Sequence, residues 1–156
     1  MPRPMPTPPW PDLVAFYNQI NQFGQANGMT LSVPAPGQAE YRMRIRPEHL
    51  SSPGIAHGGV LAGLMDAVLG AAALSLAFTT GELVATVEFK INYFQPVRLD
   101  DELLAVARVD HAGASLLVAS GTIHRTDATG APGPVVAQGL GTFNRYPAAK
   151  RQFEGM

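Results

Sequence analysis

One stretch of this chain restricts its fold more than any other. From Gly58 to Phe78 the sequence reads GGVLAGLMDAVLGAAALSLAF, which is apolar or small around a whole helical circumference and has Asp66 as its one charge. A helix that is apolar on every side must be surrounded by other elements or by lipid. The length approaches that of a membrane span, but Asp66, Ser75 and the many Ala and Gly residues favour a helix buried inside a domain.

The segments on either side of this helix can surround it. Apolar and polar side chains alternate over residues 40–46 and 83–94, as in half-buried strands. Three more strand-like runs cover 102–110, 115–126 and 135–144, and their short, turn-rich links favour antiparallel neighbours. We predict an α+β fold in which a curved antiparallel sheet of five to six strands, the last four forming a meander, wraps around the long central helix.

The 156 residues fit one domain, and no internal repeat or linker divides them. We assign residues 1–11 to a flexible proline-rich arm, 12–147 to the domain and 148–156 to a C-terminal tail. An amphipathic helix is expected over 12–27, because Asp12 can cap it and apolar residues follow at helical spacing. The arm has no continuous apolar run, which argues against a secretory signal.

Composition excludes several classes of function. A net charge of −1 with 15% charged residues leaves no basic stripe for nucleic acid, and we expect no membrane partner. The absence of cysteine removes disulfides and thiolate chemistry, and four scattered histidines make a metal site unexpected. We expect no cofactor and a cytoplasmic location.

Asp66 is the first candidate for chemistry, because an ionised carboxylate among apolar neighbours is costly unless it is paired, hydrogen-bonded or protonated. It either faces a polar seam and binds backbone amides, or it is a catalytic base or nucleophile made more basic by burial. His57-Gly58-Gly59 at the helix start favours the second interpretation. Two glycines there expose backbone amides at the positive end of the helix dipole, which suits an oxyanion, although a simple glycine turn has the same sequence.

The spacing of these residues indicates how a site could be assembled. Nine positions separate His57 from Asp66, so they lie roughly 13 Å apart on opposite faces of the helix. They cannot easily serve one carbonyl within one chain. We therefore predict an obligate homodimer with a composite site, in which His57 and Gly58 of one subunit face Asp66 of the other.

These residues resemble a known family. The segments SSPGIAHGGVLAGLMDAVLGAA, ATVEFKINYFQPVRLDDELLAVARV and VVAQGLGTF are similar to the phenylacetic-acid-degradation (PaaI-like) branch of the hotdog-fold thioesterases, and the resemblance covers roughly Ala39 to Asn144. It implies hydrolysis of acyl-CoA thioesters by dimers, which in some members pair into tetramers. By the same resemblance, Asp66 is the catalytic carboxylate, Gly58 the oxyanion amide and His57 a polarising group, while Thr86 positions the attacking water or is an ordinary strand residue.

The expected substrate contacts depart from the family in two places. Many members carry Asn or Gln six residues before the histidine, where this chain has Ser51. The turn that often presents Lys or Arg to the CoA phosphates reads HAGAS here, and His111 is its only possible cation. Arg98, Arg108, Arg125 and Ser115 are the alternative phosphate partners, unless the arginines are only surface charges. The residues that we expect to contact the substrate are Ser51, Gly59, Leu61, Met65, Arg98, Arg125 and Ser115.

Two other functions share part of this pattern. The first is a hotdog module that binds acyl-CoA without hydrolysing it, as a sensor or carrier, and Ser51 and the HAGAS turn favour it. The second is a hotdog dehydratase, which would need a His and a helix-borne Asp or Asn at another spacing that we do not find. Thioester hydrolysis is the function that we favour.

Overall fold

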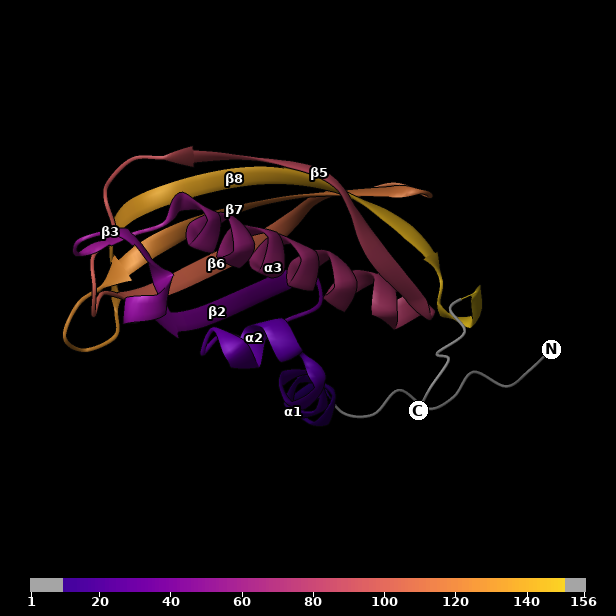
Figure 1. The fold of residues 1–156 in the computed structure, drawn as a ribbon. Coiled ribbons are helices and arrows are strands. Elements are labelled where there is room, and N and C mark those ends of the chain that lie inside the picture. Colours follow the sequence, from indigo (N-terminus) through magenta and orange to yellow (C-terminus); the bar gives the residue numbers. More distant parts are fainter. Residues whose placement is uncertain (1–9, 151–156) are drawn as a thin grey trace.

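A six-stranded antiparallel sheet curves around one long helix, α3 (Gly58–Ala77), in this computed structural model, which describes residues 10–150 (Figure 1). The strands in their order across the sheet are β1 (Thr30–Ser32), β2 (Gln38–Arg44), β6 (Glu102–Ala112), β7 (Leu116–Thr126), β8 (Pro132–Pro147) and β5 (Glu82–Tyr93). The predicted hotdog fold is confirmed. A helix on the inner face of a sheet buries the apolar sides of both elements.

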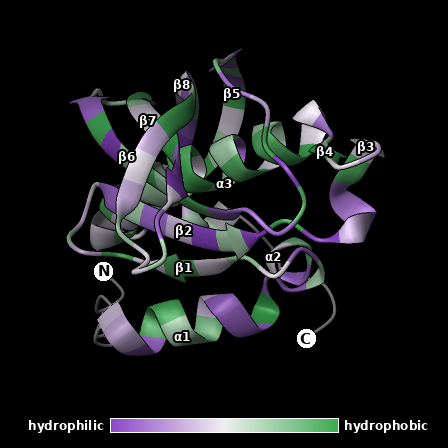
Figure 2. Cartoon of the chain, turned by 90° about the vertical axis from the view of Figure 1, so that its left-hand side faces the viewer, coloured by the Kyte–Doolittle hydropathy of each residue, from purple (hydrophilic) through white to green (hydrophobic). Residues whose placement is uncertain are grey.

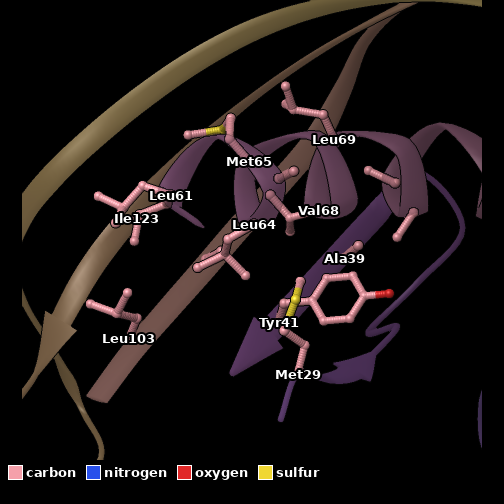
Figure 3. Packing of buried hydrophobic residues seen from close by; sticks show 14 of the residues in the cluster. Met29, Ala39, Tyr41, Leu61, Leu64, Met65, Val68, Leu69, Leu103 and Ile123 are labelled. Carbon is pink, nitrogen blue, oxygen red and sulfur yellow. The ribbon is translucent and has the colours of Figure 1, made fainter. Parts of the chain in front are cut away.

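The core lies between α3 and the inner face of the sheet. Figure 3 shows side chains of α3, including Leu64, Met65 and Val68, packed among residues from the strands. Gly139 lets β8 approach α3 closely, because it has no side chain: a Cβ there would lie only 2.8 Å from Met65 Cγ. By length and hydropathy the segment Gly58–Thr80 could span a membrane, but 56% of its most apolar window is buried inside this fold.

A short hairpin leads into α3. The 3-10 turn Pro47–His49 precedes β3 (Leu50–Ser52) and β4 (Ile55–Ala56), which form a separate two-stranded sheet. Gly54 closes this hairpin with a φ of 77°, a conformation that glycine adopts without strain. The hairpin delivers the chain to His57 at the start of α3.

The N-terminal helix differs from the prediction. One helix over 12–27 was expected, whereas the structure has α1 (Trp10–Ile20) and α2 (Gln22–Ala26). The break occurs at Asn21, whose side-chain oxygen accepts a hydrogen bond from the Gly24 amide and so caps α2. The helix also begins inside the segment assigned to the arm. Residues 1–9 of that arm and 151–156 of the tail lie outside the described residues, and Ala148–Lys150 form a 3-10 turn.

Helix α1 runs beside the short edge strand β1 (Figure 2). The Asn18 side chain joins the two elements, because its amide nitrogen donates to the Leu31 carbonyl and its oxygen accepts from the Leu31 amide. These two bonds, of 3.0 and 2.9 Å, satisfy backbone groups that an edge strand otherwise leaves open. The N-terminal helix therefore covers one edge of the sheet.

The predicted four-stranded meander is only partly correct. Strands β6, β7 and β8 follow one another as expected, but β5 pairs with β8 rather than with β6. The link over residues 94–101 is a crossover held against the β3–β4 hairpin that precedes α3, where the Ala56 amide donates to the Val97 carbonyl and the Leu99 amide to the Gly54 carbonyl. These contacts lie far apart in sequence, and the length of the link gave no sign of them.

Candidate active site

His57 is the N-cap of α3. Its backbone amide donates to the His49 carbonyl at 2.8 Å, and its Nδ1 accepts from the Gly59 amide at 2.8 Å. A ring nitrogen that accepts a hydrogen bond carries no proton, so the neutral ring in this arrangement has its proton on Nε2. His57 therefore presents an N–H donor beside the helix start.

The Gly58 amide is left open by this arrangement. The His57 side chain occupies the Gly59 amide, and no hydrogen bond among the described residues uses the Gly58 N–H. Tyr93, at the end of β5, donates its hydroxyl to the Gly58 carbonyl at 2.8 Å and so holds the following peptide, Gly58–Gly59. An unused amide at the N-terminus of a 20-residue helix is suited to a developing negative charge.

Asp66 lies two turns further along α3 and is half-buried. Its Oδ1 accepts from the Thr86 hydroxyl on β5 at 2.9 Å, while Oδ2 has no partner among the described residues. Thr86 is exposed in the single chain, so this end of the pair is open to solvent. The structure thus brings the two residues together and leaves one carboxylate oxygen available.

His57 and Asp66 are not brought together within one chain. His57 is the N-cap of the continuous helix that carries Asp66, and helical rise over nine residues separates the two by roughly 13 Å. Tyr93, which bonds to Gly58, and Thr86, which bonds to Asp66, both lie on β5, whose strand neighbour among the described residues is β8 alone. Both halves of the candidate site therefore adjoin the free edge of β5.

The predicted substrate contacts lie in different environments. Ser51 is exposed on β3, and Leu61 is 3% exposed at the wall of a cavity. Met65 is 0% exposed and packs over Gly139, which places it in the core rather than on a pocket surface. Gly59 is at the surface, but its amide is already bound to His57.

The residues expected to bind the CoA phosphates differ in how available they are for a ligand. Arg98 is exposed on the crossover near the start of α3. Arg125 is held by Asp101, with Nε 3.0 Å from Oδ2, and it donates to the Pro96 carbonyl, so it fastens the crossover. Ser115 lies in the turn between β6 and β7, where its carbonyl accepts from the Arg145 amide. Of the two arginines, Arg98 is the more available for a ligand.

Two cavities flank the start of α3. The first, of about 340 Å³, is bordered by His57, Gly59 and Val60, and the second, of about 270 Å³, by Gly58, Leu61 and the crossover. A larger hollow of about 750 Å³ lies on the sheet face opposite α3 and includes none of the candidate catalytic residues. Within the described residues, no three His, Asp or Glu side chains gather as a metal site would require.

Sequence reasoning missed His49 and Tyr93. His49 is 2% exposed; its Nδ1 accepts from the Arg46 amide and its Nε2 lies 3.1 Å from Asn27 Oδ1. Burial lowers the pKa of His49, the nearby Arg46 charge lowers it further, and Glu48 opposes both effects. Tyr93 fell in the alternating strand pattern, but the pattern did not indicate its contact with Gly58.

Comparison with known proteins identifies the family. Residues 53–131 match the model of the thioesterase superfamily. Acyl-coenzyme A thioesterase 13 of Homo sapiens is 31% identical over 116 residues, which are 73% of this chain and 77% of the human protein. The chain belongs to the thioesterase superfamily. The expectation of an enzyme of the thioesterase class is confirmed at the level of this family.

Solved structures share this fold. The conserved protein PA5202 from Pseudomonas aeruginosa is 32% identical, with a TM-score of 0.72 over 85% of this chain and 99% of that one. The PaaI protein of the E. coli phenylacetic acid degradation operon has a TM-score of 0.75 over 88% and 92% of the two chains, at 24% identity, and supports the fold. The predicted PaaI-like hotdog family is confirmed.

Proposed function

We propose that this thioesterase-superfamily member hydrolyses acyl-CoA thioesters to a free acid and CoA. The observation that carries the proposal is the open Gly58 amide beside the His57 ring, whose Nδ1 is occupied by the Gly59 amide, on the same helix as Asp66, which pairs with Thr86 of β5. Its relative, acyl-coenzyme A thioesterase 13, is named for this class of substrate.

Thioester hydrolysis requires a hydrogen-bond donor for the negative charge that develops on the carbonyl oxygen, and a carboxylate that acts as base or nucleophile. The thioester oxygen takes a hydrogen bond from the Gly58 N–H, which stabilises the oxyanion as the carbonyl carbon becomes tetrahedral. Asp66 either removes a proton from the attacking water or itself attacks the carbonyl to give a mixed anhydride that water then opens. The C–S bond breaks, and the CoA thiolate leaves and is protonated.

Thr86 has a defined part in this scheme. Its proton is donated to Asp66 Oδ1, so its oxygen is free to accept a hydrogen bond from a water held by Oδ2. This orients the water or, in the nucleophilic alternative, the carboxylate itself. Removing the hydroxyl should slow hydrolysis less than removing the carboxylate.

The site is proposed to be shared between two subunits. The free edge of β5 and the exposed apolar side chains of Val87 (58% exposed), Tyr93 (49%) and Phe94 (53%) favour pairing of β5 with its copy. Antiparallel pairing about a two-fold axis brings the Tyr93 end of one β5 toward the Thr86 end of the other. His57 and Gly58 of one subunit then face the partner's Asp66.

The test is a thiol-release assay over short, medium, long-chain and aryl acyl-CoAs, comparing the wild type with Asp66→Asn. We expect kcat to fall by about 100-fold or more, because the variant has no carboxylate to act as base or nucleophile. Glu102→Gln, which removes an exposed acid outside the site, is the matched control and should retain activity.

Equal rates in the wild type and Asp66→Asn would refute the role of Asp66. Micromolar acyl-CoA binding without thiol release by the wild type would replace hydrolysis with the non-catalytic binding function. A cytoplasmic location stays part of the proposal.

A further inference from the structure

We propose that the 340 Å³ cavity beside His57 binds the acyl chain of the substrate, that it fits a medium-length chain of about ten carbons, and that Phe23 limits this length. This inference rests on the proposed hydrolysis of acyl-CoA. It assigns the two sides of the helix start to the two halves of the thioester.

The lining of the cavity is suited to a hydrocarbon. Five apolar side chains from α2, β2, β3, α3 and the segment before β1 border it, namely Phe23, Met29, Met43, Leu50 and Val60. The two methionines can adapt their shape to a flexible chain.

The polar groups of the lining are mostly used within the protein. Both ring nitrogens of His49 are bonded, to the Arg46 amide and to Asn27, and the Asn27 side-chain nitrogen donates to the Phe23 carbonyl. A polar ligand would therefore find few unused partners in the lining, whereas an apolar chain needs none.

The charges around the helix start favour this orientation over the reverse. The charged side chain in the lining of the cavity is Glu48, which already pairs with Arg46 at 3.0 Å; no Lys or Arg borders the cavity within the described residues. The cavity therefore offers no unpaired positive charge to the phosphates of CoA. The exposed Arg98 lies on the other side, on the crossover and directly after the residues that line the 270 Å³ cavity, where the pantetheine arm and phosphates can leave.

Phe23 is placed to close the cavity. A Cβ at Gly63 would lie 2.9 Å from Phe23 Cζ, so the absence of a side chain at Gly63 is what lets the ring rest on α3. The ring remains 54% exposed, which means that it covers the cavity without being part of the core. Shortening it should open the cavity at little cost in stability.

The volume sets the expected chain length. A group of water or methylene size occupies about 30 Å³, so 340 Å³ holds on the order of ten such groups. Wild-type kcat/KM should therefore rise from acetyl-CoA to about decanoyl-CoA and fall for longer chains.

The experiment measures kcat/KM for acyl-CoAs from two to sixteen carbons with the wild type, Phe23→Ala and Phe23→Trp. We expect Phe23→Ala to raise the ratio of kcat/KM for tetradecanoyl-CoA to kcat/KM for hexanoyl-CoA by at least about tenfold, since even one methylene in an apolar pocket changes discrimination by roughly 10–200-fold. Phe23→Trp should lower the same ratio. Phe16→Ala removes a similarly exposed ring (52%) on α1 and should leave the profile unchanged.

The outcomes separate this inference from the function on which it rests. An active wild type with the same chain-length profile as both Phe23 variants would overturn the acyl-chain assignment and leave hydrolysis standing. A wild type that releases no thiol from any acyl-CoA would overturn both. Melting temperatures of the variants, expected to match the wild type within a few degrees, verify that the profile reflects the pocket and not the fold.

Discussion

His49 connects segments that are distant in sequence and that together build the start of α3. Its ring bonds to the Arg46 amide and to Asn27, and its carbonyl accepts from the amide of His57. Because Nδ1 is an acceptor, a protonated His49 would lose its bond to Arg46. The position of the candidate oxyanion amide therefore depends on a neutral imidazole that takes no direct part in the reaction.

We expect the free energy of unfolding to decrease between pH 7 and pH 5 because of His49. Burial lowers its pKa from 6.5, so the unfolded chain takes up a proton at a higher pH than the folded one, and stability is lost as the pH falls through 6.5 toward the folded value. Urea denaturation at both pH values and a fixed protein concentration measures this, and His49→Gln should show a smaller decrease. Equal decreases in both proteins would contradict it.

The pH window separates His49 from the other shifted groups. Bonds to Thr80 and Arg145 lower the pKa of Glu82 below 4.5, and bonds to Thr129 and nearby amides lower that of Asp127 below 3.8. Their contributions to stability are present above those values and are lost only in stronger acid.

Candidate residues could be predicted to different extents. His57 and Gly58 could be predicted from the sequence, because two glycines at the start of a helix expose backbone amides that can bind an anion. The proximity of Thr86 to Asp66 was implied by the family resemblance. His49 and Tyr93 were not predictable, since each depends on a contact between segments whose pairing the sequence does not specify.

At the scale of elements, Ser75 fixes α3 to the segment before β2. Its hydroxyl donates to the Ala72 carbonyl and accepts from the Gly37 amide at 2.8 Å, and the residue is 4% exposed. Replacement by alanine would leave a buried amide without a partner.

We expect Ser75→Ala to lower the free energy of unfolding by about 1–3 kcal/mol. Urea denaturation at fixed protein concentration measures the change, with Ser32→Ala, which shortens an exposed serine on β1, as the matched control. An unchanged midpoint for Ser75→Ala would show that Gly37 finds another acceptor, such as water.

Elements with local signals were predicted well, whereas their arrangement was predicted less completely. The apolar composition of α3 and the period-two alternation in the sequence of β5 are local patterns that indicate a helix and a strand, and ten of the 20 residues of α3 are buried. The break at Asn21 interrupts a pattern that is helical throughout, because one side-chain hydrogen bond starts a second helix there. The pairing of β5 with β8 depends on a crossover that is held by contacts between residues distant in sequence.

At the scale of the whole molecule, a shared site predicts recovery of activity on mixing two inactive variants. His57→Ala and Asp66→Asn each damage one half of the site, and a hybrid dimer has one site with both residues intact. Random assortment makes half of the dimers hybrid, with one good site of two, so refolding an equal mixture should recover about one quarter of wild-type thiol release. The unmixed variants are the controls.

No recovery, together with a stable and active wild-type monomer in light scattering at micromolar concentration, would show that each chain forms its own site. Recovery would also establish the two-fold partner without a structure of the complex.

The pair of hydrogen bonds from Asn18 to Leu31 limits how this protein can assemble. A sheet that is bare at both edges can add copies indefinitely and grow into a fibre. Here the β1 edge is occupied by the Asn18 side chain, which forms the hydrogen bonds that a neighbouring strand would form, and the β5 edge stays open. If two copies pair through their open β5 edges, neither has a second open edge, so strand addition stops at a dimer.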